Sequence, residues 1–285
     1  MSIRSLAIIA TGEADDETAI AIGADLAKRH QAAAIVVDAF VELPPVAVSS
    51  FEAGGLADPI VLAALERRAK NVTQQIARLV AQASAVILGP QADATGALSI
   101  AEPGETIWET LCRELPLADL VVVAQSTAAS EHHWGGPLAD ALMEARTPVL
   151  VARSAIPFAD RPAAVAWDGS FEAARAVRAA LPLLASASEV MILQDPANLQ
   201  AGRRAQADPE RLKRYLQRRG PCVSQIVEVS GRPVSQALLE AAQSAGAALL
   251  VAGAYSHSRL KETLFGGVTR DLLHAASGPH LLLAH

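Results

Sequence analysis

The sequence predicts an α/β protein of two tandem doubly wound domains, each a five-stranded parallel sheet flanked by helices. Three observations predict this fold class. Short aliphatic runs alternate with longer stretches of helical period, which is typical of βα units. The runs are almost purely apolar, as strands are when helices cover both faces of their sheet. The end of the first half recurs at the end of the second, which indicates a duplicated domain.

The repeat is clearest where each half ends. The first half closes with ADLVVVA, a variable loop and WGGPLADALMEARTPVLVAR, and the second with AALLVAG, a variable loop and FGGVTRDLLHAASGPHLLLAH. An aromatic residue, two glycines, an apolar helical stretch, a proline and an aliphatic strand recur in one order. The segment containing Ile156, Pro157 and Pro162 has the composition of a linker. We therefore predict one domain over residues 1–157 and another over residues 158–285.

Five strands are expected in each half, with helices between them. In the first half they are Leu6–Ala10, Ala34–Ala39, Ala85–Leu88, Leu120–Ala124 and Val149–Ala152, and the longest helix runs from Pro59 to about Ala83. In the second half they are Ala163–Trp167, Val190–Leu193, Ser224–Val229, Ala248–Ala252 and Leu281–Ala284. Ligands of a doubly wound sheet bind beyond the carboxyl ends of the strands, where the winding reverses. The residues that follow the first and fourth strands of each half are therefore the candidates for a site.

Composition and charge exclude several classes of function. The chain has 24 Lys and Arg residues against 30 Asp and Glu, which argues against nucleic acid or an anionic membrane as partner. The first apolar run is too short for a signal peptide, and no apolar stretch is long enough to span a bilayer. Cys112 and Cys222 lie in separate halves, which suits a reducing compartment. We expect a cytoplasmic protein.

Three stretches of the chain resemble the universal stress protein family in its tandem two-domain form. They are VAWDGSFEAARAV, VSGRPVSQALLEAA and VAGAYSHSRLKETLFGGVTRDLLHAASGPHLLLA. The resemblance is strong in the second half and weaker in the first. It implies an adenine nucleotide alpha hydrolase-like fold, an acid after the first strand that contacts adenosine, and a glycine-rich loop that holds phosphates. That loop reads as glycine, two residues, glycine, nine residues, glycine, then serine or threonine.

The second half keeps the spacing of that loop but changes two of its four positions. By the resemblance, the nucleotide-binding residues are Asp168, Gly253, Ser256, Gly266 and Gly267. Ser256 stands in place of the second glycine, and its Cβ matters if the backbone there needs a positive φ or approaches a phosphate closely. Gly267 replaces the hydroxyl residue, although its amide still opens a helix whose N-terminus favours anions.

The first half departs further from the family pattern. Thr11 and Gly12 follow its first strand, where Glu13 is the substitute for the acid. Its loop begins at Ala124 and reaches the pair Gly135-Gly136 two residues sooner than its counterpart. Such a loop is a poor phosphate nest, so we do not expect ATP to bind in this half.

Each candidate also has a purely structural interpretation. Asp168 followed by Gly-Ser is a common turn and helix cap, and capping and adenosine contact stay open as alternatives. Arg259 and Lys261 are expected to be solvated loop charges. His132 and His133 lack further ligands at metal-binding spacing. The basic stretch Arg203–Arg219 suits the exposed face of an amphipathic helix.

Motifs for hydrolase elbows, P-loops and zinc proteases are absent from the sequence. We therefore expect no catalytic residues and no protein-bound metal, and a non-enzymatic stress-response or regulatory module that binds ATP or a related adenine nucleotide, with Mg, in its second half. Two alternatives stay open: a slow ATP hydrolase, and a structural interaction protein without any nucleotide.

The last strand of each half would expose unpaired backbone groups at a sheet edge. Family domains dimerise through this strand, so the resemblance implies that Val149–Ala152 pairs with Leu281–Ala284 within one chain, as a pseudo-dimer. Whether two whole chains form a homodimer stays open.

Overall fold

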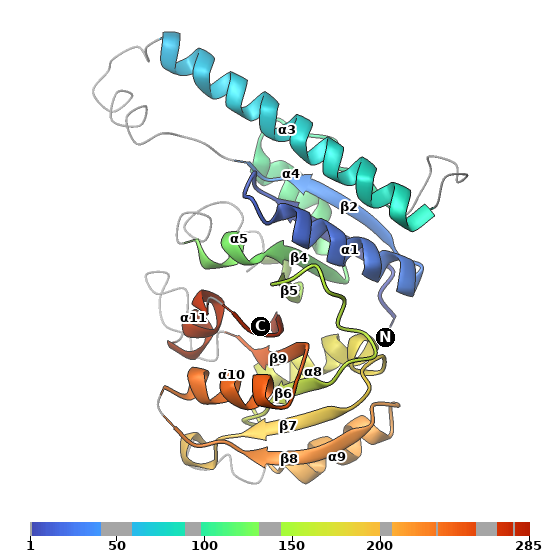
Figure 1. The fold of residues 1–285 in the computed structure, drawn as a ribbon, viewed down its shortest axis with the longest axis vertical. Coiled ribbons are helices and arrows are strands. Elements are labelled where there is room, and N and C mark those ends of the chain that lie inside the picture. Colours follow the sequence, from blue (N-terminus) through green and yellow to red (C-terminus); the bar gives the residue numbers. More distant parts are fainter. Residues whose placement is uncertain are drawn as a thin grey trace.

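The computed structural model describes residues 2–40, 59–88, 98–130, 144–199, 207–231, 233–254, 267–275 and 277–285. Two groups of five strands join into one ten-stranded sheet with helices on both faces, as Figure 1 shows. The predicted α/β fold of tandem doubly wound units is confirmed.

The elements alternate along the chain as expected. In the first half they are β1 (Ser5–Ala10), α1 (Asp16–His30), β2 (Ala33–Asp38), α3 (Pro59–Leu88), β3 (Leu98–Ile100), α4 (Ile107–Glu114), the 3₁₀ turn η1 (Leu115–Leu117), β4 (Leu120–Ala124), α5 (Gln125–Ala129) and β5 (Val149–Ala152). In the second half they are β6 (Ala163–Ala166), α8 (Phe171–Leu184), β7 (Val190–Gln194), η2 (Pro196–Asn198), α9 (Pro209–Gln217), β8 (Val223–Glu228), α10 (Val234–Ser244), β9 (Leu249–Gly253), α11 (Gly267–His274) and β10 (His280–Ala284).

The strand order is β3-β2-β1-β4-β5-β10-β9-β6-β7-β8. Within each half all pairs are parallel, and the winding reverses between the first and fourth strands, at β1/β4 and at β6/β9. The two halves meet through their last strands, because β5 and β10 pair antiparallel with Leu282 opposite Leu150. One edge of the long sheet therefore holds the carboxyl ends of the first five strands and the amino ends of the other five.

One predicted strand is wrong. Ala85–Leu88 continues α3 as helix, and the third strand of the first half is β3, ten residues further on. A short apolar run does not by itself distinguish a buried strand from the end of a helix. No glycine or proline separates this run from the helical stretch before it, and the first such residues are Gly89 and Pro90.

Successive residues of a strand point to opposite faces of the sheet and contribute to two apolar layers, one on each face. In β1, Leu6 and Ile8 pack on the face covered by α1, α3, α8 and α9, whereas Ala7 and Ile9 pack on the face covered by α4, α10 and α11. All four side chains have no exposed surface. The sheet is thus buried on both sides, which explains why its strands read as continuous apolar runs.

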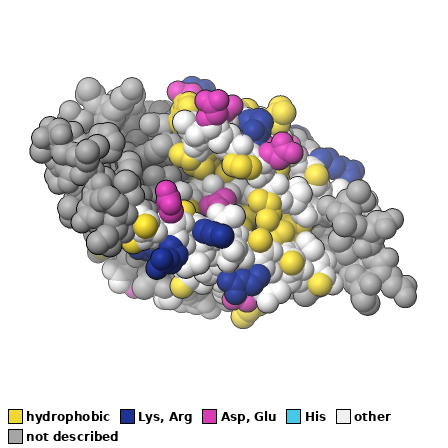
Figure 2. Space-filling model, turned by 90° about the horizontal axis from the view of Figure 1, so that it is seen from above, with side chains coloured by type: hydrophobic (Ala, Val, Ile, Leu, Met, Phe, Trp, Pro, Cys, Tyr) yellow, Lys and Arg dark blue, Asp and Glu magenta, His cyan; other side chains and the backbone are white. Residues whose placement is uncertain are grey.

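Helix α3 covers the outer strands of the first half with only part of its surface. Val72, Ile76 and Val80 recur every four residues and are buried, because that spacing places them on one stripe of the helix. Figure 2, which looks onto the α3 end of the molecule, shows acidic and basic side chains mixed with apolar ones. Among the described helices, α3 included, none combines the length and apolarity needed to cross a membrane.

The basic stretch in the second half forms the amphipathic helix that its spacing predicts, over the part that the structure describes. Leu212 and Leu216 of α9 are buried. Arg214 and Arg219 are exposed, and the Arg219 guanidinium stacks 3.8 Å above the ring centroid of Tyr215. Arg214 therefore lies on the solvated face of α9, and Arg219 lies in the exposed turn that follows the helix.

We call the junction of the two halves, where β5 pairs with β10, the seam. The side chain of Arg153, which follows β5, forms hydrogen bonds across this seam. Its Nε donates to Gln125 Oε1 at 2.8 Å, one terminal nitrogen donates to the Pro279 carbonyl at 3.2 Å, and the other to the Leu272 carbonyl near the end of α11. Gln125 in turn donates to the neighbouring carbonyl of Leu273. Two side chains of the first half thus bind the last turn of α11, and burial lowers the pKa of Arg153 to about 10.

Candidate functional site

Asp168 follows β6 and Gly253 is the last residue of β9. These two strands are neighbours, and their carboxyl ends lie side by side along one edge of the sheet. β6 and β9 are parallel with Val165 opposite Val251, so Asp168, two residues beyond β6, lies next to the end of β9. The winding reverses between these two strands. Gly267 is the first residue of α11, while Ser256 and Gly266, together with Arg259 and Lys261, lie outside the described residues.

The structural role considered for Asp168 is present. Its Oδ1 accepts a hydrogen bond from the Ser170 amide at 2.9 Å, and Ser170 Oγ accepts one from the Ala173 amide at 3.1 Å. Asp168 therefore shapes the turn, and Ser170 caps α8. Asp168 is nevertheless exposed, which leaves its carboxylate open to solvent and to a ligand.

Gly253 has a packing reason to be glycine. A Cβ at this position would lie 2.5 Å from the Ala173 nitrogen and 2.8 Å from the Glu172 carbonyl carbon, both in the first turn of α8. The end of β9 thus touches the backbone of α8 directly. The corresponding residue of the first half is Ala124, where a methyl group fits. At Gly267, by contrast, a Cβ would meet no described residue within 4 Å.

Toward β7, the segment around Ala207 covers the carboxyl ends of the strands. Gln194 Nε2 donates to the Ala207 carbonyl at 2.7 Å and to the Trp167 carbonyl at 3.3 Å. Ala207 lies against Gly169, whose φ is +75° and whose Cβ would lie 2.6 Å from the Ala207 Cα. Trp167 Nε1 is buried and has no hydrogen-bond partner among the residues that the structure describes. Ala207 therefore closes the β6–β7 part of the edge.

In the first half, carboxylates of the chain bind the amides at the corresponding edge. Asp16 Oδ2 accepts from the Gly12 amide at 2.8 Å and the Thr11 amide at 3.0 Å, and Asp15 Oδ2 accepts from the Ser126 amide at 2.9 Å. The Ser126 hydroxyl also bonds to Asp15. These bonds join the starts of α1 and α5 across the β1/β4 reversal. Glu13, which we expected to substitute for the acid, is exposed. Asp16 instead accepts hydrogen bonds from the amides of this turn.

Asp16 is 1% exposed, and this burial raises its pKa from 3.8 to about 6 despite the amide hydrogen bonds, which lower it. A raised carboxyl pKa means that the native state binds more protons than the unfolded state between about pH 4 and 6. Stability is therefore lost as the pH rises through this range. The shift from 3.8 to about 6 corresponds to about 3 kcal/mol at neutral pH.

We expect the Asp16→Asn variant to be more stable than the parent protein at pH 8, with the advantage vanishing near pH 4. Asparagine keeps one oxygen at the position of Oδ2, which accepts from both amides, and loses only the longer 3.3 Å bond from the Thr11 amide to Oδ1. Urea denaturation at pH 4, 6 and 8 measures the effect, with Glu17→Gln, an exposed acid in the same helical turn, as the charge-matched control. An advantage that does not change with pH, or that Glu17→Gln reproduces, contradicts the buried-charge explanation.

Metal ligands and nucleophiles are not gathered at the edge. Within the described ranges, no three His, Cys, Asp or Glu side chains come together in a way that could hold a metal ion. Cys112 and Cys222 are both exposed and unpaired. His132 and His133 lie outside the described residues. The chemistry visible at the β6/β9 edge is thus one open carboxylate on the turn that leads into α8.

Comparison with known proteins agrees with this architecture. Residues 161–283 match the model of the universal stress protein family. No curated protein matches the chain. A universal stress protein from Archaeoglobus fulgidus is 14% identical, with 99% of this chain and 96% of that chain covered and a TM-score of 0.68. A universal stress protein from Pseudomonas aeruginosa is 16% identical, with 99% and 93% covered and a TM-score of 0.52.

A shorter similar structure is a universal stress protein in complex with cAMP. It is 26% identical, with 44% of this chain and 97% of that chain covered and a TM-score of 0.34. The match to the family model identifies residues 161–283 as a universal stress protein domain, and the whole chain has the tandem two-domain fold that it shares with the Archaeoglobus fulgidus protein.

Proposed function

We propose that this is a cytoplasmic, non-enzymatic stress-response or regulatory module that binds one adenine nucleotide, as its Mg complex, in its second half. The observation that supports it best is the shared edge of β6 and β9. It brings Asp168 and Gly253 together at the reversal of the winding, which is where doubly wound sheets bind ligands.

The two sides of this edge suit different parts of a nucleotide. The exposed Asp168 carboxylate has one oxygen held by the Ser170 amide and is the candidate acceptor for ribose hydroxyls. The start of α11 at Gly267 offers free amides and the positive end of a helix dipole to phosphates. Among the described residues, nothing lies within 4 Å of where a Gly267 Cβ would be, which suits close approach of a phosphate to the backbone.

A single nucleotide per chain is expected, because the first half has bound the equivalent amides internally. Asp15 and Asp16 are anions that already occupy the turn amides and the start of α5. A phosphate there would have to displace a buried carboxylate and repel it as well. The first half serves in this proposal as a structural partner of the second.

The proposal is tested by denaturing freshly purified protein and chromatographing the released nucleotide, followed by calorimetric titration of emptied protein with Mg-ATP. We expect close to one adenine nucleotide per chain. Asp168→Ala should weaken binding about tenfold, since a hydrogen bond to a charged group contributes roughly 1.5–3 kcal/mol. Asp119→Ala is the matched control, because its carboxylate also binds backbone amides, those of Arg4 and Ser5 in the first half.

Each other outcome has a defined meaning. No released nucleotide and no heat with Mg-ATP would exclude the nucleotide and leave a ligand-free interaction protein. Equal affinity in Asp168→Ala and the parent protein would exclude the β6/β9 edge as the site. Release of inorganic phosphate by the parent protein but not by Asp168→Ala would show a slow ATP hydrolase instead of a non-enzymatic module.

A further inference from the structure

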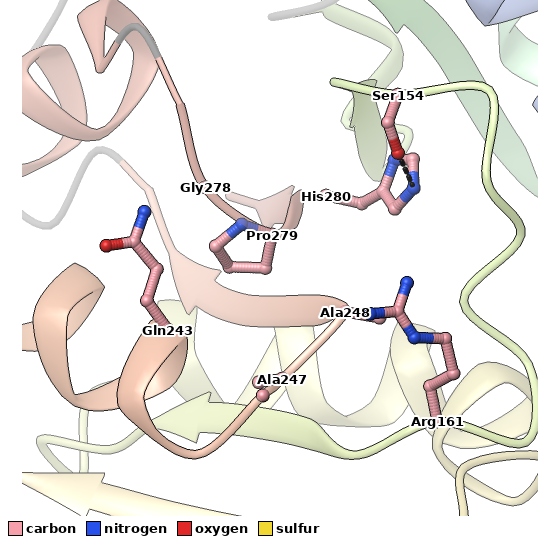
Figure 3. Close-up of a pocket in the computed structure, with 9 residues that line it drawn as sticks. Ser154, Arg161, Gln243, Ala247, Ala248, Gly278, Pro279 and His280 are labelled. Atoms are coloured by element: carbon pink, nitrogen blue, oxygen red, sulfur yellow. Dashed lines mark hydrogen bonds between the residues drawn. The ribbon is translucent and has the colours of Figure 1, made fainter.

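We infer that the protein has a second ligand site, for a small phosphate or carboxylate anion, in a pocket at the seam between the halves. The pocket lies at the amino edge of the second-half strands, across the sheet from the Asp168 edge. Its wall includes Ser154, Arg161, Gln243, Ala248, Gly278 and His280 (Figure 3). Its volume is about 290 Å³, the share of about ten water molecules, so a small molecule fits.

The pocket forms where the segment that links β5 to β6 passes the amino ends of β9 and β10. Ser154 and Arg161 belong to the segment that leaves β5, whereas Ala248 and His280 begin the pairing of β9 with β10. Gly278 has a φ of +149°, and a Cβ there would lie 2.9 Å from a terminal nitrogen of Arg153. Glycine at this position lets the wall of the pocket lie close to the half-buried side chain of Arg153. Neither half alone contains the complete set of groups.

The charge of the pocket is positive and uncompensated. None of the described side chains that line it is acidic. Among the described residues, the Arg161 guanidinium has no hydrogen bond and no ion pair, and Figure 3 shows it extending past Ala248 toward His280 and Ser154. Asp160, next along the chain, is turned to solvent and lies 3.9 Å from Arg29. A cation that points at other donors, without an acceptor, leaves room for an anion between them.

The imidazole of His280 is also affected by the positive charge of the pocket. Its Nδ1 accepts from the Arg153 amide at 3.3 Å, while Nε2 lies 3.0 Å from the Ile156 carbonyl and 3.4 Å from Ser154 Oγ. These contacts place the proton on Nε2 and keep the ring neutral. Burial is the main cause that lowers the pKa of His280, and the positive charges of Arg153 and Arg161 lower it further. His280 is thus a wall residue rather than a ligand, and its pKa responds to charge in the pocket.

Arg161 and Ser154 are the groups assigned to the anion. Arginine matches the planar oxygens of phosphate and carboxylate with two parallel N–H donors, and the Ser154 hydroxyl can add a third. Gln243 lines the pocket on the side opposite Arg161, and its side-chain amide is available to another polar group of the ligand. Pro279 and the two alanines give the floor an apolar character. The inferred ligand is therefore a small organic anion or free phosphate, independent of the nucleotide proposed at the other edge.

Nuclear magnetic resonance of His280 tests the inference, with inorganic phosphate and succinate as separate probes at constant ionic strength. The Cε1–H resonance is assigned with His280→Gln. We expect a saturable shift with at least one probe and a rise in the pKa of His280 when the anion is bound, because negative charge favours the imidazolium. A response to phosphate alone assigns a phosphate site, and a response to succinate alone assigns a carboxylate site.

The variants separate a site from a nonspecific salt effect. Arg161→Gln should weaken the probe's affinity about tenfold or more, and Arg161→Lys should retain part of it. Arg178→Gln removes an equally exposed arginine from α8 and should change nothing, as should Asp168→Ala at the other edge. No saturable shift with either probe, or an unchanged response in Arg161→Gln, would overturn the site, whatever the nucleotide experiment shows. Circular dichroism confirms that the Arg161 variants are folded.

Discussion

Replacing Arg153 with methionine is expected to lower the free energy of unfolding by about 3 kcal/mol or more. Methionine fills much of the same volume but leaves the carbonyls of Leu272 and Pro279, and the amide oxygen of Gln125, without their donor inside the seam. Buried acceptors without a partner cost far more than the same groups in water. Chemical denaturation of the full chain measures the loss.

Two further variants show whether the arginine fork is the cause. Arg153→Lys should recover little of the loss, because one ammonium group cannot reach Gln125 and the two carbonyls in their separate directions. Arg178→Met, at an exposed position of α8, should change stability by less than about 0.5 kcal/mol. A loss below about 1 kcal/mol in Arg153→Met would mean that the seam does not depend on these hydrogen bonds.

Gly169→Ala is expected to be the most damaging single methyl addition at the proposed nucleotide edge, with a loss of about 3 kcal/mol or failure to fold. The residue has a φ of +75°, and the added Cβ would lie 2.6 Å from the Ala207 Cα and 2.7 Å from its nitrogen, neither of which can turn away. Strain and a backbone clash therefore add. Soluble yield and the denaturation midpoint measure the effect.

The chain supplies a matched control for this glycine. Gly220 also has a positive φ, +105°, but a Cβ there would meet nothing within 4 Å. Gly220→Ala should therefore cost only the conformational strain, about 1 kcal/mol. The difference between the two variants isolates the contact of Gly169 with Ala207. Equal stability of both variants would show that the segment around Ala207 moves aside, and that this side of the edge is not closed.

The strands were largely predictable because helices cover both faces of the sheet. β4 and β5 have the bounds expected from their aliphatic runs, and β6, β7 and β10 differ by one residue at one end. The error at Ala85–Leu88 has a local cause, since a run of that length suits a helix end as well as a strand. Strand β3, Leu98–Ile100, has only three residues and gives almost no periodic signal.

The site was predictable only as far as topology determines it. The meeting of Asp168 and Gly253 follows from the reversal of the winding, which the order of strands and helices implies. The role of Asp16 does not follow, because ATGEADD offers Glu13, Asp15 and Asp16, and the start of α1 decides which of them turns back to the amides. Arg161 and His280 are 119 residues apart and come close only because β6, β9 and β10 pair side by side, so no local pattern in the sequence indicates their pocket.

The central position of β10 in the sheet also affects how the chain folds during its synthesis. β10 follows its neighbour β5 by the whole of the second half, so a ribosome releases β5 well before the strand that will pair with it. Until then the nascent first half presents the bare edge of VLVA, a hydrophobic template for aggregation or for wrong partners. A chain cut just before His280 would be left with two such edges, one in each half, which makes the last few residues of the sheet the ones that complete the fold.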